Sequence, residues 1–465
     1  MESSRSLRRY ALLVTLISSF FSPFMGSSLD LALKTISQDL HADAVSAIWV
    51  QLVYLLTSAA LLVPFGRAAD IYGRKKVYVA GLGVYAIATT LAATAGSIEW
   101  LIAARALQGV GGAMVFGTAV AILTSVFPPT ERGRVLGINT GTVYTGLTLG
   151  PVLGGVLTQH VGWRSIFWIT AVLSVVALVL ALLRLRGEWA GSAGQSYDWA
   201  GAVVFTISIA MLLFGISSIY RIPLARWLIP IALIGLGGFL VIQLRGRSPV
   251  LDLRRFRGNV VFFFSNLAAL IHYSATFGLG QLLSLYLQVV KGMAPDRAGL
   301  VLLVQPIMMA ILSPLTGWLS ERVQPRLLAS SGMALMAGGL LGFSTLVAAS
   351  PLALVLGLSF VVGVGYALFS APNTNAVMGS VDRTDYGVAS STLATMRVVG
   401  QAMSMSIVLL FLSIYVGTAE LNPQKVAGLS ADFLLAMHWA LRIFTVLCVV
   451  GIGASLARGK VAIKD

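Results

Sequence analysis

The sequence has few charged residues and only one cysteine. Asp, Glu, Lys and Arg make up 11% of its 465 residues, while 57% are hydrophobic. A soluble protein carries roughly 25% charged residues. Cys448 has no second cysteine to pair with, which excludes an intrachain disulfide. The chain is therefore expected to lie in a membrane.

Motifs for nucleotide hydrolysis and metal chemistry are also missing. No Gly-x-x-x-x-Gly-Lys-Ser/Thr phosphate-binding loop occurs, so ATP hydrolysis by this chain is not expected. A gradient of ions, namely protons, is the expected driving force. The histidines include no HExxH pair and no His-x-x-x-x-Asp, which argues against a membrane-embedded enzyme such as an acyltransferase. We expect a protein that is not an enzyme and has no cofactor and no metal site.

Long apolar runs recur from one end of the chain to the other. A helix needs about 20 apolar residues to cross a bilayer, and breaking the chain at charged and Pro/Gly-rich stretches leaves fourteen such runs. The first run is too long for a signal peptide, so we interpret it as an uncleaved helix. The predicted helices begin near Ala11, Ser46, Lys76, Ile98, Val135, Ser165, Trp199, Trp227, Asn259, Ala298, Leu327, Leu352, Tyr386 and Phe433.

The basic residues gather between the apolar runs, in alternate loops. With both termini inside the cell, the cytoplasmic segments hold 22 of the 32 Lys and Arg residues and the outer loops hold six. This bias follows the positive-inside rule and predicts a multi-pass protein of the cytoplasmic membrane with both termini cytoplasmic. The net charge of +15 thus reflects topology in the lipid bilayer, and we expect no nucleic-acid partner.

An internal similarity divides the chain into two halves. Gly66 precedes Asp70 by four residues at one predicted helix end, and Gly317 precedes Glu321 by four at another. Parallel repeats typify transporters whose halves rock about a midplane site. We predict an all-α fold of fourteen transmembrane helices, in two pseudo-symmetric six-helix bundles plus an accessory pair. The expected parts are an N-terminal bundle at 1–190, accessory helices at 191–244, a cytoplasmic basic linker at 245–258 and a C-terminal bundle at 259–465.

Three short motifs follow one another in the first half. GRAADIYGRKK occupies residues 66–76, RALQGVGGA residues 105–113 and GLTLGPVLGG residues 146–155. In these motifs the chain resembles the major facilitator superfamily, and within it the fourteen-helix drug:proton antiporters. The resemblance covers nearly the whole chain. It implies a monomeric exporter that exchanges small amphiphilic organic compounds or drugs for protons by alternating access.

The first motif is expected to form a gate. By the resemblance, Gly66, Asp70, Gly73 and Arg74 hold the cytoplasmic side shut, with Asp70 facing the start of a later helix at residues 386–390. A carboxylate in this place is favoured by a neighbouring arginine or by a facing helix N-terminus. Breaking the contact would open the transporter inward.

The third motif weakens a helix in its middle, because five of its ten residues are Gly or Pro. Gly146, Gly150 and Gly154 share one helix face, which lets another helix approach closely. Pro151 removes a backbone hydrogen bond and favours a bend. Together with Gly155 these positions match the exporter signature of the family. We expect a kinked span in tight contact with a partner from the other half, although small residues also pack helices in most membrane bundles.

Ionisable residues deep in the predicted spans are functional candidates, because they are costly in a bilayer unless paired or hydrated. Asp30 and Arg105 lie at comparable depths and could pair, which would make Asp30 the main proton carrier. Lys34, one turn beyond Asp30, offers an intrahelical pair instead; the stretch Asp30-Leu-Ala-Leu-Lys34 stands where the family usually has Asn-x-Ala-Leu-Pro. His272 is either a proton or substrate contact or a hydrogen-bonded packing residue.

Polar and aromatic residues on the helices expected to line the cavity form the candidate substrate site, although each could instead be a packing residue. They are Lys34, Tyr144, Asn266, Tyr273, Gln281, Gln305 and Arg397. One deep acid beside several basic groups favours neutral, zwitterionic or anionic amphiphiles over dications as substrates.

Two other functions stay open. One is a metabolite-specific exporter or permease of the same fold, although the Gly-Pro motif at 146–155 disfavours an importer. The more remote one is a membrane sensor that does not transport.

Overall fold

The computed structural model describes residues 2–192, 194–246, 249–251, 254, 258–320, 322–381, 386–417 and 426–459. In these ranges the extended regular elements are helices, and thirteen helical segments are long and apolar enough to span a membrane. The remaining expected span is α5 (Pro129–His160), which is rich in glycine and polar residues. The prediction of an all-α fold with fourteen spans is confirmed.

The first bundle consists of six long helices. Their starts follow from local chemistry: Asp43 and Ser97 are N-caps whose side chains accept hydrogen bonds from the backbone N–H groups of Ser46 and Trp100. Gly73, with φ of 119°, makes the break between two of the helices. The helices are α1 (Glu2–Asp39), α2 (Ala44–Tyr72), α3 (Arg74–Ala93), α4 (Ile98–Val126), α5 and α6 (Arg164–Arg184).

The second bundle contains two spans that are broken into pieces. The first is α9 (Val260–Thr276), α10 (Gly278–Leu285) and the π-helix η2 (Tyr286–Val290), and π-helical turns are frequent at functional sites. The next is α11 (Pro295–Leu302) followed by α12 (Val304–Leu319). The continuous helices are α13 (Pro325–Phe343), α14 (Leu352–Gly379), α15 (Tyr386–Tyr415) and α16 (Val426–Ala457).

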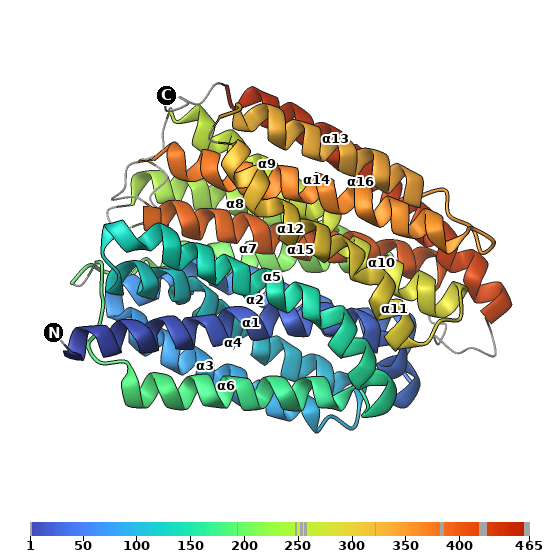
Figure 1. Cartoon of the computed structure of the whole chain (residues 1–465), viewed down its shortest axis with the longest axis horizontal. Helices are drawn as coiled ribbons and strands as arrows, with labels where there is room; N and C mark the ends of the chain where they lie inside the picture. Colours follow the sequence, from blue (N-terminus) through green and yellow to red (C-terminus); the bar gives the residue numbers. More distant parts are fainter. Residues whose placement is uncertain are drawn as a thin grey trace.

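Two further helices lie between the bundles in sequence. The first, α7 (Trp199–Ser218), packs on α2 of the first bundle and on α15 of the second, whereas α8 (Ala225–Arg245) packs mainly on α7. Figure 1 shows the six N-terminal helices on one side and α9 to α16 on the other, with α5 running along the boundary. Part of the predicted linker at 245–258, and Glu321 of the internal repeat, lie outside the described residues.

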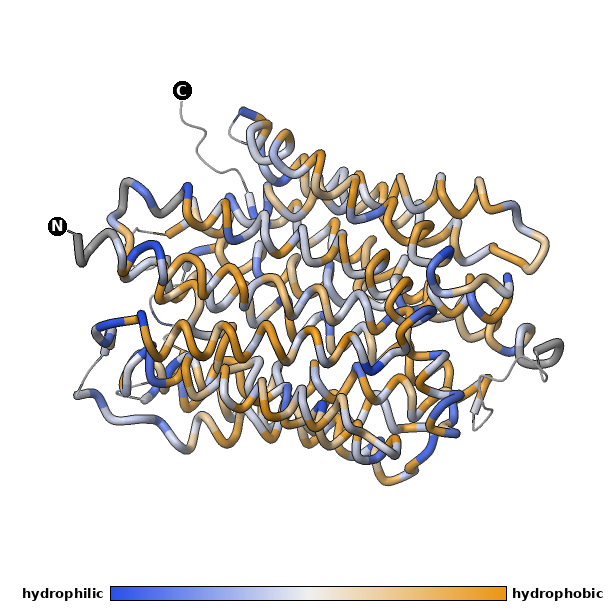
Figure 2. Tube along the Cα trace, turned by 60° about the horizontal axis from the view of Figure 1, so that its bottom comes forward, coloured by the Kyte–Doolittle hydropathy of each residue, from blue (hydrophilic) through white to orange (hydrophobic). Residues whose placement is uncertain are grey.

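The surface of the bundle suits a bilayer. Large apolar side chains stay exposed on the outer helices, for example Leu183 at 68% and Ile234 at 75%, which would be unfavourable in water. Figure 2 shows hydrophobic residues along the middle of the helices and hydrophilic ones gathered at their ends. We call the end remote from both chain termini, where α1 ends at Asp39 and α5 at His160, the distal end (Figure 1).

Candidate functional site

Glycines of α5 allow α1 to pack at backbone distance. A Cβ added at Gly146 would lie 2.6 Å from the carbonyl oxygen of Phe20, and one at Gly154 would lie 2.5 Å from Cβ of Ser28. The Ser28 hydroxyl donates a hydrogen bond of 3.0 Å to the carbonyl of Gly150. We expected the face formed by Gly146, Gly150 and Gly154 to pack on a helix of the other half. That expectation is wrong, because the helix that packs there, α1, belongs to the same half as α5.

A different face of α5 meets the second half. A Cβ at Gly155 would lie 2.5 Å from the carbonyl oxygen of Pro295 at the start of α11. One turn further along α11, Gly299 lies against the carbonyl of Pro151. The tight contact with the other half is thus present, but it is made by Pro151 and Gly155 and depends on Gly299, which sequence reasoning missed.

Asp30 lies on α1 where the two halves meet. Its Oδ1 atom accepts a hydrogen bond of 3.1 Å from Nε2 of Gln51 on α2. On the side of the second half it faces Gly280 of α10, where an added Cβ would lie 3.1 Å from Oδ2. Across the described part of the chain, no Lys or Arg forms an ion pair with Asp30. A membrane carboxylate with only a neutral amide as partner is well suited to bind a proton.

Arg105 is held by its own bundle, so the expected Asp30–Arg105 pair is wrong. Its Nε donates to the carbonyl of Val50 at 2.9 Å and its Nη1 contacts Sδ of Met25 at 3.3 Å. A further hydrogen bond goes to Gln108 of the same motif, and the guanidinium lies 4.4 Å from the ring centre of Tyr54. With 1% of its surface exposed, Arg105 ties α1, α2 and α4 together.

Lys34 does not pair with Asp30 either. Its Nζ donates a hydrogen bond of 2.8 Å to the carbonyl of Gln288 in η2, in the other half. The Ser284 hydroxyl donates to the backbone carbonyl of Asp30 at 2.5 Å, and Nε2 of Gln288 donates to that of Leu31 at 3.2 Å. These three bonds join α1 to α10 and η2. Ser284 and Gln288, one helical turn apart, were not singled out from the sequence.

His272 is packed among aromatic rings. It stacks on Phe369 of α14, with ring centres 3.9 Å apart and an angle of 16°, and meets Tyr366 and Tyr273 edge-on at 4.6 and 4.9 Å. Neither ring nitrogen has a hydrogen-bond partner among the described residues, although the side chain is fully buried. His272 is thus packed as one interpretation expected, but without the expected hydrogen bonds among the described residues. Its role as a proton or substrate contact stays a prediction.

Other predicted cavity residues surround this cluster. Arg397 of α15 lies 5.2 Å from the ring centre of Tyr273, and it forms no ion pair with any described acid. Tyr144 of α5 forms a hydrogen bond of 3.2 Å with Ser370 of α14, which crosses between the halves. Tyr366 and Phe369 were missed, although their spacing of three places them on one helix face.

The predicted amides have different surroundings. Asn266 donates to the carbonyl of Phe262 at 2.9 Å and leaves its own oxygen without a partner in the described structure. Gln281 of α10 is buried, and neither of its terminal atoms has a described hydrogen bond. The backbone of Gln305 lies against Gly363, where an added Cβ would be 2.9 Å from the carbonyl of Gln305, so that position packs α12 on α14.

The first motif binds a loop of its own half. Arg74 forms an ion pair of 2.7 Å with Asp70 and donates a hydrogen bond of 2.6 Å to Ser125. Glu188, which was not predicted, accepts hydrogen bonds from the backbone N–H groups of Lys75 and Lys76 in the first turn of α3. Its carboxylate occupies the space beside Gly73. An acid at a helix N-terminus is stabilising.

The expected contact of Asp70 with the start of α15 stays a prediction. The ion pair described for Asp70 is with Arg74 of its own motif. The side chains of residues 386 and 387 lie outside the described ones. At Gly66 an added Cβ would meet no atom within 4 Å.

Comparison with known proteins agrees with this architecture. A family model described as the Major Facilitator Superfamily matches residues 15–405. The chain is similar to the riboflavin transporter RibZ of Clostridioides difficile, at 27% identity over 444 residues and 95% of each chain. It is also similar to the cephamycin export protein CmcT of Amycolatopsis lactamdurans, at 32% identity over 88% of this chain and 85% of the relative.

A solved structure shows the same fold. The inward-facing, unoccupied crystal structure of a bacterial homologue of the human lysosomal transporter Spinster matches with a TM-score of 0.70. The match covers 97% of each chain at 16% identity. The chain is a multi-pass membrane transporter that belongs to the major facilitator superfamily.

Proposed function

We propose that the protein is a proton-coupled antiporter that exports small amphiphilic organic compounds by alternating access of its two halves. In this proposal it works as a monomer in the cytoplasmic membrane, with both termini in the cytoplasm and the distal end facing outward. The bundles at 1–190 and 259–465 rock about their interface, and the accessory helices at 191–244 lie outside the transport path.

The main support for the proposal is the position of Asp30 at the interface between the two halves. Its side chain is partly exposed and has one neutral partner, Gln51, while its own backbone carbonyl receives a hydrogen bond from Ser284 of the other half. Closing the distal end brings α10 onto α1 and separates the carboxyl group from the water at that end. An unpaired carboxylate is costly in that setting, so closure favours the protonated acid. Proton binding and the movement of the halves are then linked.

In the proposed cycle, this linkage drives the exchange of substrate for protons. With the distal end open, Asp30 meets outside water and takes up a proton, and the protein can then close. Once the cytoplasmic side opens, water returns to Asp30 and the proton leaves toward the cytoplasm. Substrate that binds on the cytoplasmic side is carried outward on the return step, which gives exchange of one solute for protons.

The aromatic cluster around His272 suits an amphiphilic substrate. Tyr366 is partly exposed beside the buried rings of Tyr273, Phe369 and His272. Arg397 offers a cation with no described acidic partner. Tyr144 brings a hydroxyl from the first half into contact with the second. CmcT, a relative of 32% identity, is a cephamycin export protein.

Proton-linked transport by inverted membrane vesicles tests the proposal. A respiration-driven pH gradient is followed by a fluorescent dye while a panel of toxic amphiphiles is added. We expect substrates to dissipate part of the gradient with the wild-type protein but not with Asp30→Asn. Asp39→Asn is the matched control, since Asp39 binds Arg164 at the distal end. Coupled transport that persists in Asp30→Asn at normal expression would overturn the role of Asp30.

A metabolite-specific transporter is the second candidate function. Similarity to the riboflavin transporter RibZ over 95% of each chain favours it. Riboflavin therefore belongs in the same panel, and a response to riboflavin without any response to the toxic amphiphiles would favour a metabolite-specific transporter over an exporter of amphiphiles.

A further inference from the structure

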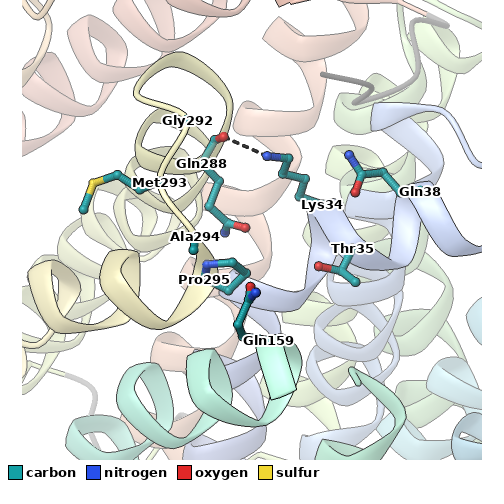
Figure 3. A pocket seen from close by; sticks show the side chains of 9 residues that line it. All are labelled: Lys34, Thr35, Gln38, Gln159, Gln288, Gly292, Met293, Ala294 and Pro295. Atoms are coloured by element: carbon teal, nitrogen blue, oxygen red, sulfur yellow. Dashed lines mark hydrogen bonds between the residues drawn. The ribbon is translucent and has the colours of Figure 1, made fainter. Parts of the chain in front are cut away.

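Buried polar atoms without a hydrogen-bond partner occur at both ends of the second half, and they differ in kind. In the cavity that Lys34 and Gln288 help to line at the distal end (Figure 3), the unpartnered atom is an acceptor, Oε1 of Gln288. The Lys34 ammonium there is already bonded to the carbonyl of Gln288. At the opposite end the unpartnered atoms are Nε of Arg326, Oγ of Ser330 and Nη1 of Arg458. Because arginine nitrogens can only donate, this second group calls for an acceptor.

Arg458 is the most deeply buried of these side chains. It follows the last residue of α16, and 1% of its surface is exposed. Its Nε donates a hydrogen bond of 2.9 Å to the carbonyl of Ser455, and its Nη2 donates one of 2.7 Å to the Ser455 hydroxyl. Nη1 is left over, and no described acid forms an ion pair with Arg458. A buried cation without a counter-ion is costly, so an anion at this point would be stabilising.

The three unpartnered groups line one seam between α13 and α16. Met333 of α13 packs on Gly451 of α16, where an added Cβ would meet the Met333 side chain. Ser330 and Arg326 precede Met333 by three and seven residues, so they share its face of α13. Arg458 follows Gly451 by seven residues and lies on the facing side of α16. All three groups therefore border the same seam, at the end that holds the chain termini.

The seam lies at the edge of the protein, where lipid can reach it. Figure 1 shows α13 and α16 side by side at the edge of the second bundle. The Ser455 hydroxyl links them, because it accepts from Arg458 and donates to the carbonyl of Arg326 at 3.4 Å. Arg326 is partly exposed. Leu327 and Leu456, close to the two arginines in sequence, expose 52% and 45% of their surfaces. Cationic donors thus stand beside exposed apolar side chains.

We propose that the seam between α13 and α16 is a binding site for the phosphate group of an anionic phospholipid. The phosphate oxygens accept hydrogen bonds from Arg326, Ser330 and Arg458, since arginine donates strongly to phosphate. The acyl chains lie against Leu327 and Leu456. Basic pockets between transmembrane helices bind lipid headgroups in this way. Inorganic phosphate has the same oxygens without the chains and is the alternative source. The site does not depend on the proposed exchange of substrate for protons.

Lipid binding to the purified full-length protein in neutral detergent tests this site. Native mass spectrometry measures the affinity, and the melting temperature reports stabilisation by a bound ligand. The probes are phosphatidylglycerol, phosphatidylcholine with the same acyl chains, and inorganic phosphate. We expect one phosphatidylglycerol to bind about tenfold more tightly than phosphatidylcholine, because the choline cation opposes the arginines. It should also raise the melting temperature, whereas inorganic phosphate at the same concentration should not.

The unpartnered atoms provide variants that separate binding from folding. Nε of Arg326 and Oγ of Ser330 have no partner among the described residues, so a double variant with Arg326→Met and Ser330→Ala should melt like the wild-type protein when no lipid is added. It should bind phosphatidylglycerol about tenfold more weakly. Arg322→Met is the matched control, since it removes one charge at the same end of the protein. Arg322 is exposed and lies 3.9 Å from the ring centre of Trp318, and its loss should leave binding unchanged.

Four results would overturn the proposal. Equal affinity for the two lipids would show that the negative charge is not recognised. Unchanged phosphatidylglycerol binding in the double variant would show that these donors do not form the site. An equal loss of binding in Arg322→Met would show general attraction to a basic surface. Equal stabilisation by inorganic phosphate would make free phosphate, rather than a lipid, the ligand.

Discussion

Replacing Gly155 by alanine should open the distal end of the transporter. The added Cβ would lie 2.5 Å from the carbonyl oxygen of Pro295, and ordinary contact begins at 3.4 Å. The two helices must therefore separate by about 1 Å at that point, in line with a cost of about 1–3 kcal/mol for overpacking. Because Pro295 belongs to the other half, this cost falls on the closed conformation alone. It corresponds to a shift of about 5- to 150-fold in the ratio of closed to open protein.

Thiol labelling measures that shift. Ser284 is fully buried behind the distal contact and its hydroxyl binds the carbonyl of Asp30, so Ser284→Cys places a reporter where only the open state exposes it. The native cysteine is removed by Cys448→Ala. A membrane-impermeant maleimide added on the distal side should label the reporter several-fold faster when Gly155→Ala is present.

Gly137 provides the matched control for this experiment. It lies in the same helix, α5, and an added Cβ there would meet no atom within 4 Å. Gly137→Ala has the same effect on helix propensity and should leave the labelling rate unchanged. Equal labelling rates in Gly155→Ala and wild type would refute the inference that the α5–α11 contact holds the distal end closed.

Two further predictions concern stability. Arg105→Lys keeps the charge but cannot reproduce the contacts with Val50 and Gln108, so the purified protein should melt several degrees lower, and an unchanged melting temperature would contradict the bracing role. Burial alone would raise the pKa of Asp43, but hydrogen bonds from Arg221 and Ser46 outweigh it and hold the pKa below its usual 3.8. The stability that Asp43 contributes is thus present above pH 3.8 and is lost as the pH falls through the lower folded value. Asp43→Asn should lower the melting temperature at pH 7, and its difference from wild type should vanish at strongly acidic pH; a difference independent of pH would exclude this explanation.

The local contacts of the site could be predicted only in part. The comparable depths of Asp30 and Arg105 were readable from their distances to a helix end, but depth does not say which way a side chain points around its helix. In the structure Asp30 faces Gln51 and α10, while Arg105 faces Val50 and Met25. The glycine face of α5 likewise indicated a close helix neighbour without identifying it as α1.

The sequence by itself determined the fourteen spans and the family, because hydropathy, charge and short motifs are local properties that add up along the chain. Only the tertiary structure decided the partners of Asp30 and Lys34, the crossing of Gly155 with Pro295, and the cavity at the distal end. Each of these depends on the rotation and packing of helices from distant parts of the chain. The rotation and packing of the helices depend on how many side chains fit together at once, so they cannot be predicted from any single stretch of sequence.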